Sequence, residues 1–214
     1  MSETPAQYYQ RMKALAMAKR ELYKVETSKI NLTLIRSIYK SEGVKIDYWI
    51  PKGRKIKACY FADGEPSVMV DKNLPNEPKI FALVHELKHH WVDRDAILDG
   101  VHKCGAYDDN NFVEIGAEVF AAQFIYPDTE MLTDLENFGV PTTGCTPEHI
   151  VRFKNACSAP VSYTFLVKRF ERFKRIEVGL CKKVKFKKLE EQIFGTPVYK
   201  RPSFIRNRKK RRIL

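Results

Sequence analysis

The stretch His85-Glu86-Leu87-Lys88-His89 places two imidazole rings four residues apart, with a glutamate between them. Residues four apart lie on one face of an α-helix, so both rings can bind one zinc ion while the glutamate stands beside a metal-bound water. The same spacing also arises by chance, and the histidines of an ordinary helix only pack or form hydrogen bonds. The motif therefore predicts a metal site if a helix carries it and a third ligand lies nearby.

The residues around this stretch predict the required helix. Asn76-Glu77-Pro78 is a suitable start, with Asn76 as the cap and Pro78 in the first turn. Apolar residues then recur at offsets of 4, 3 and 4 and form one stripe: Ile80, Val84, Leu87 and Trp91. We expect this stripe to pack, while the other face presents His85 and His89.

A second predicted helix supplies an acidic ligand. It covers residues 112–126, with capping residues in Asp108–Asn111 and a stop at Pro127. Glu114 and Glu118 lie four residues apart on one face of this otherwise apolar helix. Buried carboxylates need partners, and a zinc ion and the outer N–H of a ligand histidine would satisfy one each. We therefore assign Glu114 to the metal and Glu118 to a ligand histidine; the alternative is that both face water.

The same helix carries a longer pattern, Glu114-x-x-Ala117-x-x-Phe120-Ala121-Ala122, and closes with Phe124-Ile125-Tyr126-Pro127. Together with the first motif, this pattern resembles the ImmA/IrrE family of metallopeptidases. Members typically show the zinc motif, an acid, Ala-Asn, Phe-Ala-Ala and a hydrophobic run that ends in proline.

The resemblance implies His85, His89 and Glu114 as zinc ligands and Glu86 as the catalytic acid and base. Lys88 stands where the family commonly has Gly, and Glu118 stands where it commonly has Asn or Asp. Neither departure removes a ligand, and a carboxylate at position 118 can still accept a histidine N–H.

Three short strands are predicted before the zinc helix, at Val44–Ile50, Lys55–Phe61 and Ser67–Asp71. A small sheet in this position resembles the family's catalytic core. The predicted fold class is therefore α+β: a zincin-like core with a three-stranded sheet and the HExxH helix, plus C-terminal helices and a basic tail. An edge of the sheet could pair with an extended substrate peptide, or the sheet could be purely structural.

We divide the chain into four segments. Residues 1–43 form an N-terminal helical segment, with helices at Pro5–Val25 and Ser28–Lys40. Residues 44–130 form the metallopeptidase core. Residues 131–180 form a C-terminal helical module, and residues 181–214 form a flexible basic tail.

The helical module has two predicted helices, which open at Thr146-Pro147 and at Ser162. With basic residues on the second helix, the pair could be a helix-turn-helix that reads DNA. However, residues 162–170 resemble a Ser-x-x-Ala-Leu-x-x-Arg-Leu stretch that the family often carries here, which favours packing beside the core.

The positive charge belongs mainly to the end of the chain. From Lys182 onward, thirteen basic residues face two acidic ones, which accounts for +11 of the formal net charge of +12. The tail is expected to attract nucleic acid or an acidic partner without reading a sequence, or to be a solvated appendage. Its final basic residues are Arg206, Arg208, Lys209, Lys210, Arg211 and Arg212.

Composition indicates a cytoplasmic protein without a membrane partner. Residues 1–20 contain no long apolar run, and no later stretch would span a bilayer. The five cysteines include no Cys-x-x-Cys pair, which suits a reducing compartment better than a disulfide framework. Cys104 could compete for zinc, although a free thiol is favoured.

Three classes of function compete. The favoured one is a zinc endopeptidase that cleaves a peptide or protein substrate, with Glu86 moving the proton from water to the leaving amine. The resemblance implies a regulatory protein as the substrate, such as a helix-turn-helix transcriptional repressor. The alternatives are a regulatory or nucleic-acid-associated sensor with little or no proteolysis, and a structural protein with an accidental motif.

Two features of the predicted site stay open. Zinc suits two histidines and one carboxylate best, with manganese or iron as alternatives. An oxyanion donor is also expected, and five residues are candidates: His90, His102, Tyr107, Tyr126 and His149.

Overall fold

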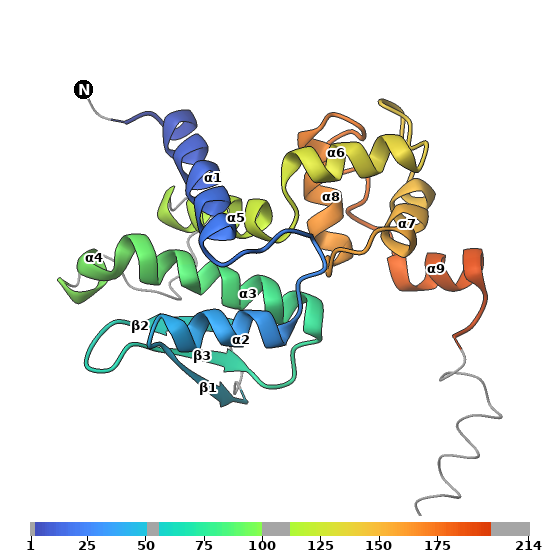
Figure 1. Cartoon of the computed structure of the whole chain (residues 1–214). Helices are drawn as coiled ribbons and strands as arrows, with labels where there is room; N and C mark the ends of the chain where they lie inside the picture. Colours follow the sequence, from blue (N-terminus) through green and yellow to red (C-terminus); the bar gives the residue numbers. More distant parts are fainter. Residues whose placement is uncertain (1–2, 51–55, 100–111, 198–214) are drawn as a thin grey trace, which may run out of the picture. The chain divides into compact units, whose positions relative to one another are not determined.

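The computed structural model describes residues 3–50, 56–99 and 112–197 and confirms the predicted α+β class (Figure 1). Its contacts divide the chain into two compact units. Unit 1 consists of residues 1–134 and 158–162, and unit 2 consists of residues 135–157 and 163–214. The predicted N-terminal helical segment and the predicted core therefore belong to the same unit.

Unit 1 begins with α1 (Pro5–Leu22). The side chains of Thr4 and Gln7 form a reciprocal capping box, and Pro5 occupies the first turn, where its missing N–H costs no hydrogen bond. The helix ends before the predicted Val25, and the Val25 N–H donates to the carbonyl of Arg20 at 2.8 Å.

The second helix, α2 (Leu32–Ser41), starts later than predicted. The side chain of Asn31 accepts a hydrogen bond from the Leu34 N–H at 3.0 Å and so caps the helix. The predicted start at Ser28 is wrong, because the Ser28 hydroxyl instead bonds the carboxylate of Glu130, far along the chain.

The three predicted strands are present as β1 (Lys45–Trp49), β2 (Ala58–Phe61) and β3 (Ser67–Asp71). Their spatial order is β1-β3-β2, with β1 parallel and β2 antiparallel to the central β3. Side chains alternate between the two faces of the sheet, and one face is buried through four residues: Ala58, Tyr60, Val68 and Val70. Because residues 51–55 are not described, the start of the second predicted strand lies partly outside the described residues.

The HExxH helix is α3 (Asn76–Lys88), and it packs on β2 and β3. Its first helical residue is Asn76, and the preceding Pro75 occupies the capping position without a side-chain hydrogen bond. The predicted capping role of Asn76 is therefore wrong. The apolar stripe of Ile80, Val84 and Leu87 is buried as predicted.

The helix changes its winding directly after Lys88. Residues His89–Asp93 form a π-helix, η1, and Arg94–Leu98 form α4. Trp91, the last residue of the predicted apolar stripe, lies in this π-helical segment and is half-buried. The centroid of its ring lies 6.0 Å from that of Tyr23 and 5.7 Å from that of Phe120.

The predicted helix that carries Glu114 is α5 (Phe112–Ile125), and α3 lies between this helix and the sheet (Figure 1). Its capping residues, Asp108–Asn111, lie outside the described residues. Pro127 ends α5 as expected, and α6 (Asp128–Asn137) follows. α5 also packs along α1. Consequently, the ligand face of α3 is covered, and almost the whole second half of that helix is buried.

Unit 2 contains α7 (Pro147–Ala156) and α8 (Tyr163–Arg172), which confirms the two predicted C-terminal helices. Its core includes Ile150, Phe153, Leu166 and Phe170. A further helix, α9 (Phe186–Phe194), lies within residues 181–214, the segment predicted to be a flexible tail, so the first part of that segment is helical. The rings of Tyr163 and Phe186 stack at 4.7 Å and attach α9 to α8.

Two general expectations concern the whole chain. Within the described ranges, no helix combines the length and the apolar character needed to cross a bilayer. The cysteines described there all carry free thiols: Cys59, Cys145, Cys157 and Cys181. Cys104, the possible competitor for zinc, lies outside the described residues.

Candidate metal centre

Two consecutive pieces of one helix supply the histidines. His85 lies near the end of α3 and His89 begins η1, and their side chains are buried. The four-residue spacing places the rings 5.0 Å apart between centroids, and the two Nε2 atoms face each other at 3.2 Å. The pair is therefore on one face of the helix, as the sequence predicts.

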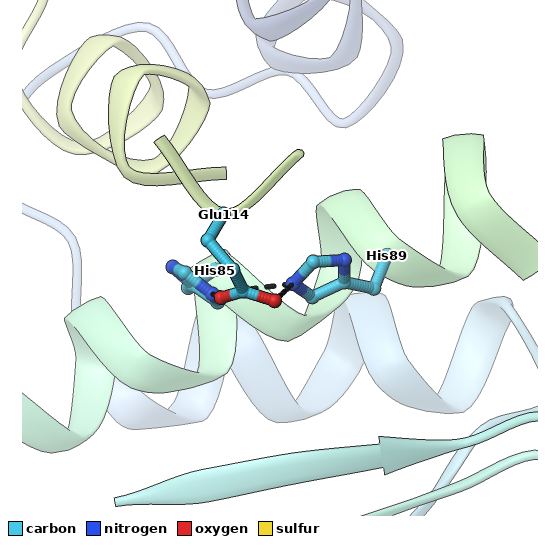
Figure 2. A group of neighbouring side chains, drawn as sticks. All are labelled: His85, His89 and Glu114. Atoms are coloured by element: carbon cyan, nitrogen blue, oxygen red, sulfur yellow. Dashed lines mark hydrogen bonds and ion pairs between the residues drawn. The ribbon is translucent and has the colours of Figure 1, made fainter. Parts of the chain in front are cut away.

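Glu114 reaches this pair from the first turn of α5 (Figure 2). Its Oε2 lies 3.0 Å from Nε2 of His85, and its Oε1 lies 3.4 Å from Nε2 of His89. One ligand atom of each residue falls within 4.8 Å of the others. The structure thus brings together the three predicted ligands from two helices separated in sequence.

These separations fit a bound metal ion. Tetrahedral zinc with bonds of about 2.0–2.2 Å holds its ligand atoms about 3.3–3.6 Å apart. The three measured separations, 3.0, 3.2 and 3.4 Å, are close to that value. Two imidazoles and one carboxylate are also a donor set that divalent zinc accepts, with a fourth position left for water or substrate.

The charges of this cluster depend on one another. Burial by itself would raise the pKa of Glu114, but hydrogen bonds from His85 and His89 hold that pKa well below its usual range. Burial likewise lowers the pKa of His89, yet its bonds to Asp93 and Glu114 outweigh burial and raise the pKa to about 9. The buried site therefore favours a carboxylate at Glu114 and positive charge beside it.

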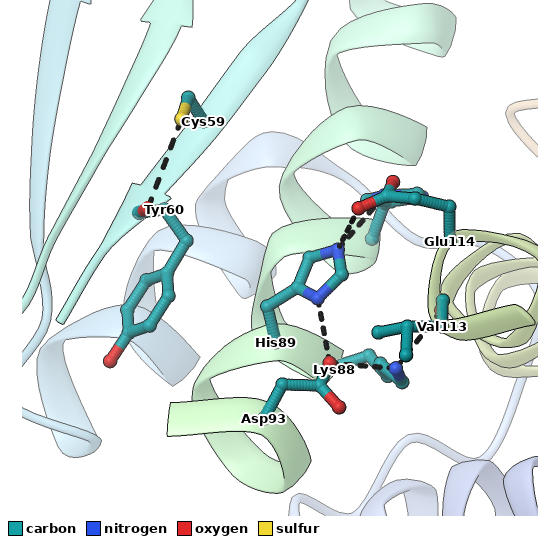
Figure 3. Close-up of polar contacts among 8 residues, drawn as sticks. Cys59, Tyr60, Lys88, His89, Asp93, Val113 and Glu114 are labelled. Atoms are coloured by element: carbon teal, nitrogen blue, oxygen red, sulfur yellow. Dashed lines mark hydrogen bonds and ion pairs between the residues drawn. The ribbon is translucent and has the colours of Figure 1, made fainter. Parts of the chain in front are cut away.

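A second buried group adjoins the first, and it contains Lys88 (Figure 3). Oδ2 of Asp93 accepts from Nδ1–H of His89 and from Nζ of Lys88, each at 2.7 Å. Nζ of Lys88 also donates to the carbonyl of Val113 at 3.0 Å, next to Glu114. Lys88 and Asp93 thus link the histidine helix to the helix that carries the acid.

The sequence of this region matches a known protein family. Residues 37–145, just over half of the chain, match the IrrE N-terminal-like domain, Peptidase_M78. The chain belongs to this family. No curated protein matches it significantly.

Membership in the IrrE-like family confirms the predicted resemblance and supports a peptidase, which is a hydrolase. The matched residues contain the whole sheet, α3, η1 and α5, and therefore all three candidate ligands. A buried His–His–Glu group in a peptidase family is compatible with a metal ion.

Two acids complete the predicted site of this IrrE-like chain. Glu86 lies on α3 between the histidines, is only 4% exposed, and its charge helps to raise the pKa of His89. Glu118 lies one turn after Glu114 on α5 and is half-buried. The position at Nδ1 of His89, for which Glu118 was a candidate, is taken by Asp93. A role for Glu118 stays a prediction.

Three of the predicted oxyanion donors lie within the described residues: His90, Tyr126 and His149. His90 bonds the hydroxyl of Tyr60 through Nδ1 at 2.9 Å, and its Nε2 lies 3.4 Å from a carboxylate oxygen of Glu42. The Tyr126 hydroxyl donates to Asp134, and His149 belongs to unit 2. Both ring nitrogens of His90 therefore have structural partners.

The remaining candidates, His102 and Tyr107, lie outside the described residues. So do the basic residues of the tail: Arg206, Arg208, Lys209, Lys210, Arg211 and Arg212. The binding of nucleic acid or an acidic partner by the tail stays a prediction.

Sequence reasoning missed Asp93 and the partners of Lys88. A signal for Asp93 was available, because it follows His89 by four residues, the spacing at which helical side chains meet. Lys88 and Asp93 are five apart, and on an α-helix such residues point in different directions. The π-helical turn brings the side chains of Lys88 and Asp93 together, and the sequence contains no pattern that predicts this turn.

Proposed function

We propose that this protein is a zinc-dependent endopeptidase. The observation that carries the proposal is the buried cluster of His85, His89 and Glu114, with Glu86 between the histidines, in a chain of a peptidase family. His85 and His89 would hold the ion through Nε2, and Glu114 would hold it through its carboxylate.

A zinc ion bound there supplies Lewis acidity, which lowers the pKa of a bound water and polarises the scissile carbonyl. Glu86 takes the proton of the attacking water as the new C–O bond forms. It then gives this proton to the leaving nitrogen as the C–N bond breaks. Asp93 keeps the proton of His89 on Nδ1, so that Nε2 presents its lone pair.

The substrate we propose is a regulatory protein of the helix-turn-helix repressor class. The support is the family resemblance, which includes the acid-carrying helix and its Phe-Ala-Ala segment. Within the described part of the chain, the outer edges of β1 and β2 pair with no further strand. An extended segment of the substrate can add to such an edge through main-chain hydrogen bonds, which tolerate many sequences.

The test compares the wild type with Glu86→Gln on a purified DNA-binding repressor encoded next to this protein's gene. We expect Glu86→Gln to retain about one equivalent of zinc and to lose cleavage by a factor of about 10²–10⁴, because a proton acceptor is removed and no ligand is. Glu77→Gln is the matched control: it changes the same residue type in the first turn of α3 and should cleave normally.

Equal cleavage by the wild type and Glu86→Gln would refute the mechanism. A regulatory sensor makes a different prediction, since its activity would survive Glu86→Gln and depend on zinc binding only. A chain that binds no zinc at all would refute both.

A further inference from the structure

Lys88, the neighbour of His89 in the chain, carries an ammonium group but has no exposed surface. Removing an ammonium group from water is costly unless close partners replace the lost solvation. Here the partners are the carboxylate of Asp93, at 2.7 Å, and the carbonyl of Val113, at 3.0 Å. The ring of Tyr8 adds a third, with its centroid 5.6 Å from Nζ.

These partners come from three segments. Asp93 ends η1, Val113 lies in the first turn of α5, and Tyr8 belongs to α1. Nζ of Lys88 is therefore a junction between the helix that carries both histidines and the helix that carries Glu114. Any movement of that turn of α5 away from α3 would break the bond to Val113 and displace Glu114.

Asp93 acts directly on a ligand. Its Oδ2 accepts both from Nδ1 of His89 and from Nζ of Lys88. A carboxylate at Nδ1 selects the tautomer whose Nε2 is free to bind a metal ion, and it fixes the ring orientation. Lys88 holds the same oxygen in place, so the orientation of His89 depends on Lys88 through Asp93.

Lys88 also balances negative charge in this buried region. Asp93, Glu86 and Glu114 contribute three negative charges to this buried region. One divalent ion and the ammonium of Lys88 together offset them. Without Lys88, the metal-loaded site would carry one uncompensated negative charge, and Asp93 would lose its cationic partner.

We infer that Lys88 and Asp93 are a coupled pair of positioning residues for the metal site: Lys88 holds Asp93 against His89 and holds the turn of α5 that presents Glu114. This inference rests on the proposed metal site. It predicts that metal affinity depends on Lys88 although its ammonium is no ligand.

The experiment measures the zinc dissociation constant of the full chain by competition with a chromogenic chelator. We expect Asp93→Asn and Lys88→Met each to weaken zinc binding by about 10–100-fold, as losing the partner of a ligand histidine does in other zinc proteins. The double variant should bind zinc about as weakly as the more strongly affected single variant, because Lys88 and Asp93 act on His89 through the same contact.

Lys79→Met is the matched control. Lys79 is a buried lysine on the same helix, and its Nζ donates to the carbonyl of Lys72 at 2.9 Å, outside the metal cluster. This variant should keep zinc affinity within about twofold of the wild type, whatever it does to stability. If Lys88→Met fails to fold, Lys88→Gln takes its place, since Gln retains N–H donors but not the charge, and weaker zinc binding is again expected.

Three results would overturn the inference while leaving the proposed function intact. One is a Lys88→Met or Lys88→Gln protein that binds zinc like Lys79→Met. Another is an Asp93→Asn protein with unchanged affinity. The third is a double variant whose loss equals the product of the two single losses, because the residues would then act independently. A wild type that binds no zinc would instead refute the proposed function itself.

Discussion

In unit 2, the buried guanidinium of Arg175 donates to two backbone carbonyls, those of Val140 and Pro141, at 2.9 and 2.7 Å. Around His89 in unit 1, by contrast, buried ionisable side chains bond one another: Lys88 to Asp93, Asp93 to His89, and His89 to Glu114. A cation held by carbonyls fastens a loop. A group of mutually bonded imidazoles and carboxylates surrounds one point, and such a group can bind an ion.

The largest effect expected from this difference follows loss of a ligand. His85→Ala and Glu114→Ala should each reduce bound zinc from about one equivalent to background and abolish cleavage, because two ligands hold the ion poorly. Elemental analysis and the repressor cleavage assay measure this. His149→Asn, which changes a histidine whose Nδ1 accepts from the Thr146 N–H, should retain its zinc. Zinc retained by Glu114→Ala would contradict the assignment.

Metal removal should distinguish the two units within one protein. At free zinc about 100–1,000 times its dissociation constant, a chelator should lower the free energy of unfolding by about 3–4 kcal/mol, since zinc binds only the folded site. Amide exchange should show the lost protection in α3 and α5, while α7 and α8 keep theirs. His85→Ala should not respond to the chelator. Equal loss of protection in α7 and α8 would show that the ion is not confined to unit 1.

Arg175→Met tests the structural cation. It should lower the free energy of unfolding by about 2–3 kcal/mol, because the carbonyl of Val140 loses its donor and the carbonyl of Pro141 keeps only the thiol of Cys145. The zinc dissociation constant should not change. Urea denaturation and chelator competition give the two values, with the exposed Arg172→Met as the control. Weaker zinc binding in Arg175→Met would remove the distinction between the units.

Gly116→Ala probes the packing of α5 on α1. An added Cβ would lie 2.3 Å from Cε1 of Tyr8, so the ring must move, at an expected cost of about 1–3 kcal/mol in stability. Urea denaturation measures the loss. In Tyr8→Ala/Gly116→Ala, the combined loss should be smaller than the sum of the single losses, because the collision is gone. Additive losses would mean that the two residues do not collide.

The smallest effect is expected at a helix cap in unit 1. Asn31→Ala should lower the free energy of unfolding by about 1 kcal/mol, since the Leu34 N–H loses its acceptor. Zinc affinity should stay unchanged, because α2 supplies no ligand. Thr33→Ala, at an exposed position of the same helix, is the control. An Asn31→Ala protein as stable as this control would show that the cap contributes nothing.

Features that depend on residues close together in the sequence could be predicted, whereas features that depend on contacts between distant residues could not. The HExxH helix and the strands were predictable because each depends on a short repeat of apolar residues. Glu114 was predictable because a carboxylate in an apolar helix needs a partner, and the histidines were the available one. The start of α2 is not predictable in the same way, because Ser28 and Asn31 are both suitable capping residues. The choice between them depends on Glu130, a residue distant in sequence, which bonds the hydroxyl of Ser28 and leaves Asn31 as the cap.

By itself, the sequence determined which residue types can meet on one helix face, since the spacing of His85 and His89 acts through the local geometry of a helix. Only the tertiary structure decided that Lys88 would be buried, that Asp93 would hold His89, and that the helix would widen into η1. These features depend on α5 packing against α3 and on α1 packing against α5, and such contacts between distant segments leave no periodic trace in the chain.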